Sequence, residues 1–248
     1  MSKRLGWMIA VIAVAISVAA RAAEPGAEKI KALLITGCDV SAHRWYETSP
    51  ELRRILEETG RFTVYISEEP GVLESQAIHD YPVLILNYMN NQRPSLSDPA
   101  KANLLRYVDS GKGLVCFHFS AAAFRDWDAQ YIPLIARAWR EGSGHGPRGA
   151  FTVEIADREH PIGRGAEDFQ TDDELYAKLV GDKPIHVVAR AYSDWSQRVE
   201  PIAFVHSYGQ GRVFNYELGH DVAALQPAPV RRLFARGTEW AATGDVKD

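Results

Sequence analysis

The chain has 248 residues, of which 46% are hydrophobic, and this length suits one domain of the larger α/β kind. Its formal net charge is −4, and no stripe of basic residues runs through it. Affinity for nucleic acid comes mostly from ionic contacts of Lys and Arg with phosphate groups. The net negative charge therefore excludes nucleic acid as an expected partner.

The N-terminus has the pattern of a secretory signal. Lys3 and Arg4 precede an apolar run that extends from Leu5 to about Ala20, and Ala20-Arg21-Ala22 offers small residues where a signal peptidase reads them. We therefore expect a signal peptide over residues 1–22 and export to the periplasm or the cell exterior. The alternative is a retained membrane anchor, for which the run is short. After cleavage we expect no stable anchor and one domain over residues 30–242.

Two cysteines, Cys38 and Cys116, lie at or near the ends of apolar, strand-like runs. An oxidising compartment permits a disulfide, but a bridge requires the two strand ends to be neighbours with suitable geometry. We expect two small buried thiols.

In the first half of the chain, strands and helices alternate. Continuous apolar runs predict strands at residues 31–36, 62–67, 82–87 and 113–118. Helical spacing predicts helices at residues 49–58, 98–109 and 126–139, the first with Ser49 as N-cap and Pro50 in its first turn. This alternation predicts a doubly wound parallel sheet covered on both faces.

The second half is richer in strands. We expect them at residues 151–155, 185–192, 201–207 and 212–216, with a hairpin turn at 207–211 and a final helix at about 228–241.

Polar and aromatic residues follow the predicted strands, where open α/β sheets bind their ligands. Such a pocket, with a polar floor and aromatic walls, suits a small-molecule carbohydrate. His145, in the glycine-rich segment 142–147, belongs either to a lid over this pocket or to a simple connection. The predicted substrate-binding residues are His43, Trp45, Asn87, Tyr88, Ser120 and His145.

His118 closes an apolar strand and precedes a turn of small residues, a place where several α/β enzymes carry their nucleophile. Here the residue is a histidine, which suits acid–base chemistry. Glu174 and His220 follow later in the chain, while Asp172 and Asp173 are expected in a solvated turn.

Several motifs in order resemble the ThuA-like family of the trehalose-utilisation type. They cover nearly the whole chain from about Lys31 to Trp240, and they are Gly111–His118, His160-Pro161-Ile162, Asp173–Tyr176, Tyr208–Phe214 and Leu218-Gly219-His220. The resemblance implies a class I glutamine amidotransferase-like, flavodoxin-like fold with an antiparallel extension. It also implies sugar metabolism, with His43, His118, Glu174 and His220 as the family-type polar positions. The usual glycine-histidine start is Gly37-Cys38-Asp39 here, with the histidine later at His43, which leaves the role of His43 open.

Glutaminase activity is not implied by this resemblance. The amidotransferase pattern needs a cysteine in a glycine-rich elbow, and in this chain His118 falls near the elbow while Cys116 lies two residues earlier within the strand.

Three functions follow as hypotheses. The first is a hydrolase or lyase acting on glycosides or 3-keto-glycosides, with His118, Glu174 and His220 as catalytic acid–base residues. The second adds a divalent metal such as Zn²⁺, with these same three residues as candidate ligands, although no closely spaced metal motif occurs. The third is a non-catalytic carbohydrate-binding module whose stacking faces come from Trp45, Tyr88, Trp127 and Trp195.

Overall fold

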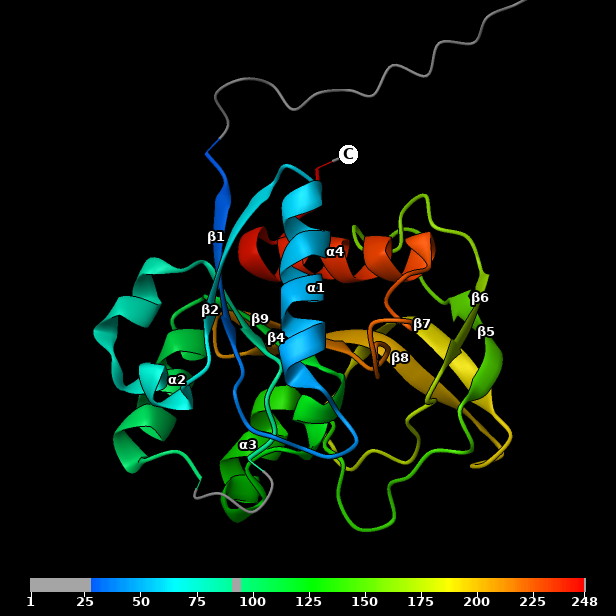
Figure 1. The fold of residues 1–248 in the computed structure, drawn as a ribbon, viewed down its shortest axis with the longest axis horizontal. Coiled ribbons are helices and arrows are strands. Elements are labelled where there is room, and N and C mark those ends of the chain that lie inside the picture. The colour runs from blue at the N-terminus through cyan, green and yellow to red at the C-terminus, as the bar shows by residue number, and fades with distance from the viewer. Residues whose placement is uncertain (1–27, 91–94, 248) are drawn as a thin grey trace, which may run out of the picture.

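The computed structural model describes residues 28–90 and 95–247, and within them one sheet of nine strands forms the centre of the molecule (Figure 1). Five strands in the order β2-β1-β3-β4-β9 are parallel to one another. This is the flavodoxin-like order, in which the chain starts inside the sheet and reverses its winding direction between β1 and β3. The bounds are β1 Ile30–Ile35, β2 Phe62–Ser67, β3 Val83–Leu86, β4 Gly113–Phe117 and β9 Gly211–Tyr216.

An antiparallel extension continues the sheet beyond β9. Strand β8 pairs antiparallel with β9, and β7, β5 and β6 follow outward, each antiparallel to its neighbour. Figure 1 shows this extension to one side of the helices. The predicted fold, a doubly wound and mostly parallel sheet with an antiparallel extension, is confirmed. The bounds are β5 Gly149–Ile155, β6 Phe169–Asp173, β7 His186–Ser193 and β8 Arg198–Tyr208.

Helices cover both faces of the parallel part. Helices α1 (Trp45–Glu58) and α4 (Ala228–Thr243) pack on one face, and α2 (Asp98–Asp109) and α3 (Asp128–Ile135) pack on the other. Successive strand residues alternate between the two cores: Leu34 packs with α1 and α4, whereas Leu33 and Ile35 pack with α2 and α3. Short 3₁₀ helices occupy Pro70–Glu74, Gln76–Asp80, His118–Ala122 and Arg125–Trp127.

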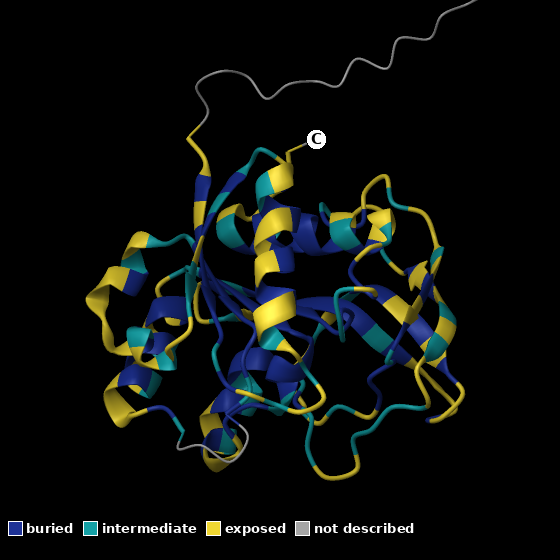
Figure 2. Cartoon of the chain, in the orientation of Figure 1, coloured by how far each residue is buried: buried dark blue, intermediate teal, exposed yellow. Residues whose placement is uncertain are grey.

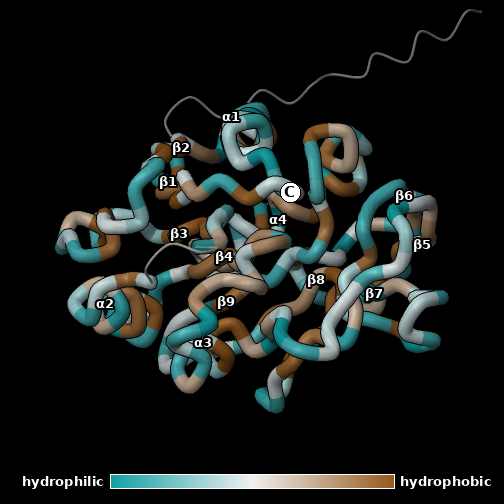
Figure 3. The backbone as a smooth tube through the Cα atoms, turned by 60° about the horizontal axis from the view of Figure 1, so that its bottom comes forward, coloured by the Kyte–Doolittle hydropathy of each residue, from teal (hydrophilic) through white to brown (hydrophobic). Residues whose placement is uncertain are grey.

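The central strands are buried along their length, which explains their continuous apolar sequences (Figure 2). The tube coloured by hydropathy shows apolar segments gathered in these strands and on the inward sides of the helices (Figure 3). The strand ends are therefore rigidly placed, and the loops that leave them can hold side chains in fixed positions.

Two helix predictions are corrected by the structure. Helix α1 begins at Trp45, so Pro50 lies inside it, and the buried Ser49 hydroxyl bonds Thr36 Oγ1 at 3.1 Å instead of capping the helix. Helix α3 ends at Ile135 because Ala136 has a φ of 65°, which a right-handed helix cannot continue. The preceding Arg125–Trp127 turn is 3₁₀.

Strand β6 was missed altogether. Its sequence, FQTDD, has a single strongly apolar residue, although Thr171 and Asp173 alternate inward as a strand requires. This omission matters, because β6 ends at Asp173 and leads directly into Glu174, and both belong to the site described below.

Cys38 and Cys116 are both buried and are not joined by a disulfide, which confirms the expected thiols. The predicted signal peptide lies outside the described residues. Among the residues that are described, no helix is long and apolar enough to span a membrane.

Candidate functional site

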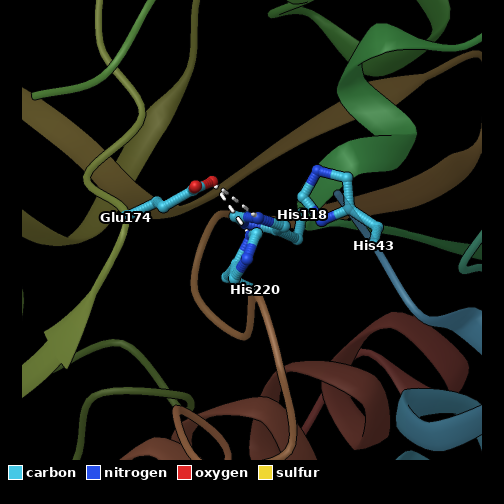
Figure 4. A group of neighbouring side chains, drawn as sticks. All are labelled: His43, His118, Glu174 and His220. Carbon is cyan, nitrogen blue, oxygen red and sulfur yellow. Dashed lines mark ion pairs between the residues drawn. The ribbon is translucent and has the colours of Figure 1, made fainter. Parts of the chain in front are cut away.

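Three imidazoles and one carboxylate converge at the ends of the strands. His43, His118, His220 and Glu174 each offer one ligand atom, and these atoms all lie within 4.8 Å of one another (Figure 4). The histidines come from the segments that follow β1, β4 and β9, so they meet at the carboxyl edge of the parallel strands, as the sequence predicted. Glu174 follows β6 directly and reaches the same place from the extension.

His118 is held in one orientation by the main chain. Its side chain is fully buried, and its φ of 41° places it in the left-handed region at the end of β4. Its Nδ1 lies 2.9 Å from the carbonyl oxygen of Glu217, which can only accept, so Nδ1 carries the proton. The neutral ring therefore presents an unprotonated Nε2, which lies 3.8 Å from Glu174 Oε2.

The Glu174 carboxylate is the centre of the cluster. His220 Nδ1 lies 3.0 Å from Glu174 Oε2, and His145 Nε2 lies 3.5 Å from Glu174 Oε1. His220 Nδ1 forms an ion pair with Glu174, whereas His118 Nε2 is a buried atom without a hydrogen-bond partner among residues 28–90 and 95–247. An unpartnered imidazole nitrogen that faces a carboxylate is the arrangement that a cation between them would complete.

His43 closes the cluster from the β1 side. Its ring stacks on Phe119 with a centroid distance of 4.6 Å and meets the His220 ring edge-on at 4.7 Å. Its Nε2 lies 3.4 Å from the Tyr176 hydroxyl, while its Nδ1 is buried and has no hydrogen-bond partner in the described part of the chain. The structure thus places His43 with the three predicted catalytic residues.

The environment shifts these pKa values in two opposite directions. Burial, together with His220, lowers the pKa of His43 to about 4, and burial together with His43 lowers the pKa of His118 well below its usual value. By contrast, the Glu174 carboxylate raises the pKa of His220. Burial of Glu174 acts to raise its pKa, but His220, His145 and His43 outweigh it, so the pKa of Glu174 is lowered. His43 and His118 are therefore neutral near pH 7.

These residues fit a divalent transition metal. Imidazole and carboxylate together are a ligand set that Zn²⁺ and similar ions prefer, and an imidazole must be neutral to bind. The bond from His118 Nδ1 to a backbone carbonyl is also one of the contacts by which metal-binding histidines are oriented. The structure places His43 beside the three residues that the sequence gave as candidate ligands.

Asp173 was wrongly expected in a solvated turn. Its side chain is fully buried, and it accepts main-chain hydrogen bonds from Gly219 (2.6 Å), Glu174 (2.8 Å) and His220 (3.2 Å). Burial raises its pKa to about 6 despite these donors. Asp172, which is exposed as expected, pairs with Arg148 at 2.8 Å. The alternation of β6 separates the two, and recognition of that strand would have found Asp173.

Other predicted substrate contacts lie in the framework around the cluster. Asn87 is fully buried and donates to Ser49 Oγ at 2.8 Å, and the Ser120 hydroxyl accepts from the Tyr88 main chain at 2.9 Å and donates to a strand carbonyl. Direct contact of Asn87, Tyr88 and Ser120 with a substrate stays a prediction. Trp45, at the start of α1, is partly exposed and donates to Asp39 Oδ1 at 2.8 Å.

Aromatic rings that the sequence did not indicate line the cluster. Tyr176 stacks on His118 with centroids 4.1 Å apart, and Trp139 packs edge-on against Tyr176 at 4.4 Å. His145, the most exposed histidine of the group, has 34% of its side chain accessible. It is therefore the imidazole that a ligand would meet first.

Comparisons with known proteins agree with the motif order. The chain is similar to a ThuA-like protein from Parabacteroides merdae, with 28% identity, a TM-score of 0.79 and coverage of 89% of this chain and 92% of that one. A ThuA-like protein from Bacteroides uniformis is 18% identical, with a TM-score of 0.72 and coverage of 91% and 96%.

A β-galactosidase from Bacillus circulans shares only the fold, at 12% identity and a TM-score of 0.58, over 88% of this chain and 31% of the enzyme. No curated protein matches the chain. The model of the ThuA family, described as trehalose utilisation, matches residues 31–241, and the chain therefore belongs to the ThuA family.

Proposed function

We propose that this protein is an exported enzyme of sugar metabolism that acts on a glycoside or 3-keto-glycoside at a divalent metal centre. The observation that carries the proposal is the meeting of His43, His118, His220 and Glu174, whose ligand atoms lie within 4.8 Å. A purely acid–base site would use its imidazoles as proton carriers, but the pKa values of His43 and His118 are too low for that role near pH 7. Neutral, preoriented nitrogens suit ligation instead.

A bound divalent ion would supply a Lewis acid that polarises a carbonyl or hydroxyl oxygen of the sugar. His145 lies outside the four-ligand set but within 3.5 Å of Glu174, and its exposed ring is placed to exchange a proton with a substrate. For a 3-keto sugar, removal of the acidic proton beside the carbonyl would permit cleavage of the glycosidic bond by elimination. Tyr176 and Trp139 would provide the apolar wall beside that sugar.

The surroundings of Cys116 support the expectation that this protein does not carry out glutaminase chemistry. Its thiol is fully buried, 4.0 Å from the Tyr131 hydroxyl, and burial raises its pKa well above the usual value. A buried and protonated thiol is a poor nucleophile.

The proposal is tested with glycosides and 3-keto-glycosides, using product analysis with and without a chelator. We expect turnover that is abolished by the chelator and restored by added Zn²⁺, Mn²⁺ or another divalent ion. His145→Asn is expected to lower turnover while metal content stays unchanged, and His186→Asn, an exposed histidine paired with Asp157, serves as the matched control. Undiminished turnover by the metal-free protein would overturn the metal centre.

A carbohydrate-binding module without catalysis is the second candidate. Exposed aromatic rings favour it: Tyr46 is 55% exposed beside Trp45, and Trp195 is 43% exposed. Sugar binding without any product, unaffected by His145→Asn, would support this reading.

Export is tested separately by N-terminal sequencing of the protein recovered from its host. A mature chain that begins at Ala23, found in the periplasm or the medium, is expected. A chain that retains residues 1–22 and stays in the cell would contradict the predicted signal peptide.

A further inference from the structure

We infer that Asp173 is the positioning residue that joins the two segments carrying Glu174 and His220, and so sets the geometry of the metal site. The inference rests on the proposed metal centre, and it assigns a specific task to a residue outside the four ligands.

Glu174 and His220 come from opposite directions. Glu174 follows β6 in the outer extension, whereas His220 follows β9, and the two strands are separated in the sheet by β8, β7 and β5. The sheet hydrogen bonds therefore do not fix one against the other. Side-chain contacts or hydrogen bonds between the two loops must do so.

The Asp173 carboxylate makes this link. Oδ2 accepts from the Gly219 main-chain nitrogen at 2.6 Å, and Oδ1 accepts from those of His220 at 3.2 Å and Glu174 at 2.8 Å. One buried carboxylate thus holds the main chain at both ligands. A carboxylate that accepts several main-chain donors is costly to replace, because each buried donor would lose its partner.

Gly219 shows how closely the two segments are fitted. Its φ is 102°, and a Cβ at this position would lie 2.4 Å from the Phe117 ring. The main chain can therefore pass between Phe117 and Asp173 only at a glycine, and the bond to Asp173 fixes the path that leads to His220.

A second link joins the same segments on the outside. Arg148 pairs with Asp172 and with Asp221, the neighbours of Asp173 and His220. These groups are substantially exposed, with 63% of the Asp172 side chain accessible, so the pair contributes little. Asp172 is consequently a matched control: it is the same residue type, one position away, and it joins the same segments from the solvent side.

The test compares Asp173→Asn and Asp172→Asn in the full chain, with Co²⁺ alone as the probe. Asp173→Asn is expected to weaken Co²⁺ binding about 10–100-fold, the usual effect of losing an outer partner of a metal ligand, and to change the Co²⁺ absorption spectrum. Asp172→Asn is expected to match the wild type in both Co²⁺ affinity and absorption spectrum. Wild-type affinity and spectrum in folded Asp173→Asn, or equal weakening in the two variants, would overturn the inference.

Amide hydrogen exchange in the wild type provides a measurement that does not depend on the folding of a variant. Because Gly219 and His220 donate to a buried carboxylate, their amide protons are expected to exchange slowly in the metal-free protein. Fast exchange at Gly219 would overturn the inference. If the wild type binds no Co²⁺ while Gly219 is protected, the link between the segments stands and the metal centre of the proposed function falls.

Discussion

The Nδ1 atom of His118 bonds the main-chain carbonyl of Glu217 at 2.9 Å, and this contact decides what the opposite nitrogen can do. Because Nδ1 must donate, Nε2 is left with a lone pair that faces the Glu174 carboxylate at 3.8 Å. Two acceptors facing each other in a buried site are unfavourable unless a cation lies between them.

His118→Asn is expected to abolish tight metal binding while the fold is retained. Asparagine tolerates the positive φ at this position better than most residues, but it cannot reach the carboxylate with an imidazole nitrogen. The loss should be about 100-fold or more, since removal of an outer partner alone costs 10–100-fold. Calorimetric titration with Zn²⁺ measures it, and His186→Asn should behave as the wild type does. Equal affinity in both variants would exclude His118 from the site.

Metal affinity is expected to fall as the pH is lowered through the pKa of His220. That pKa is raised by Glu174, so His220 must release its proton before it can bind an ion, whereas His43 and His118 are already neutral. Titrations in buffers of different ionisation enthalpy should therefore show about one proton released per ion below this pKa and none well above it. Release of two or three protons would show that His43 and His118 are charged in the free protein.

His206 is expected to contribute to acid unfolding. Burial lowers the pKa of His206 to about 4, from 6.5, and its Nε2 bonds the Leu134 carbonyl at 2.9 Å. Because the unfolded chain binds this proton more readily, the stability that the neutral ring supports is complete above pH 6.5. It is lost as the pH falls toward 4, by up to about 3 kcal/mol.

The check on His206 is urea unfolding of the wild type and of His206→Gln, which keeps a donor for the carbonyl. The variant should lose less stability than the wild type between pH 7 and pH 4.5. Parallel losses in the two proteins would refute the assignment.

Both cysteines are expected to be unreactive in the native protein and free after unfolding. Cys38 and Cys116 are buried, and neither forms a disulfide in the structure. A thiol reagent added without reductant should count two thiols in denaturant and almost none in buffer. An absence of thiols in denaturant would indicate a bridge formed on export.

The sequence alone was sufficient to predict the parallel part of the sheet. The strands from Val83 to Leu86 and from Gly113 to Phe117 are continuous apolar runs, which burial on both faces requires. The histidine cluster also followed from sequence, because the carboxyl ends of parallel strands meet at one edge and so bring His43, His118 and His220 together.

What could not be predicted depended on tertiary contacts. Asn87 lies at a strand end like the site residues, yet its side chain bonds Ser49 in α1. No local sequence pattern distinguishes a strand-end residue that faces the site from one that bonds a neighbouring helix. Asp173 looked like one of two solvated acids, because the strand that turns it inward has only one strongly apolar residue. His43 joins the cluster through a turn in which its main chain bonds Val40, a contact with no clear motif.

The most direct measurement is anomalous X-ray diffraction at the zinc edge from crystals of the full chain grown with one equivalent of Zn²⁺. We expect a single peak among His43, His118, His220 and Glu174, about 2.0–2.2 Å from three ring nitrogens and a carboxylate oxygen. A cluster without a peak, or an ion bound only elsewhere, would contradict it.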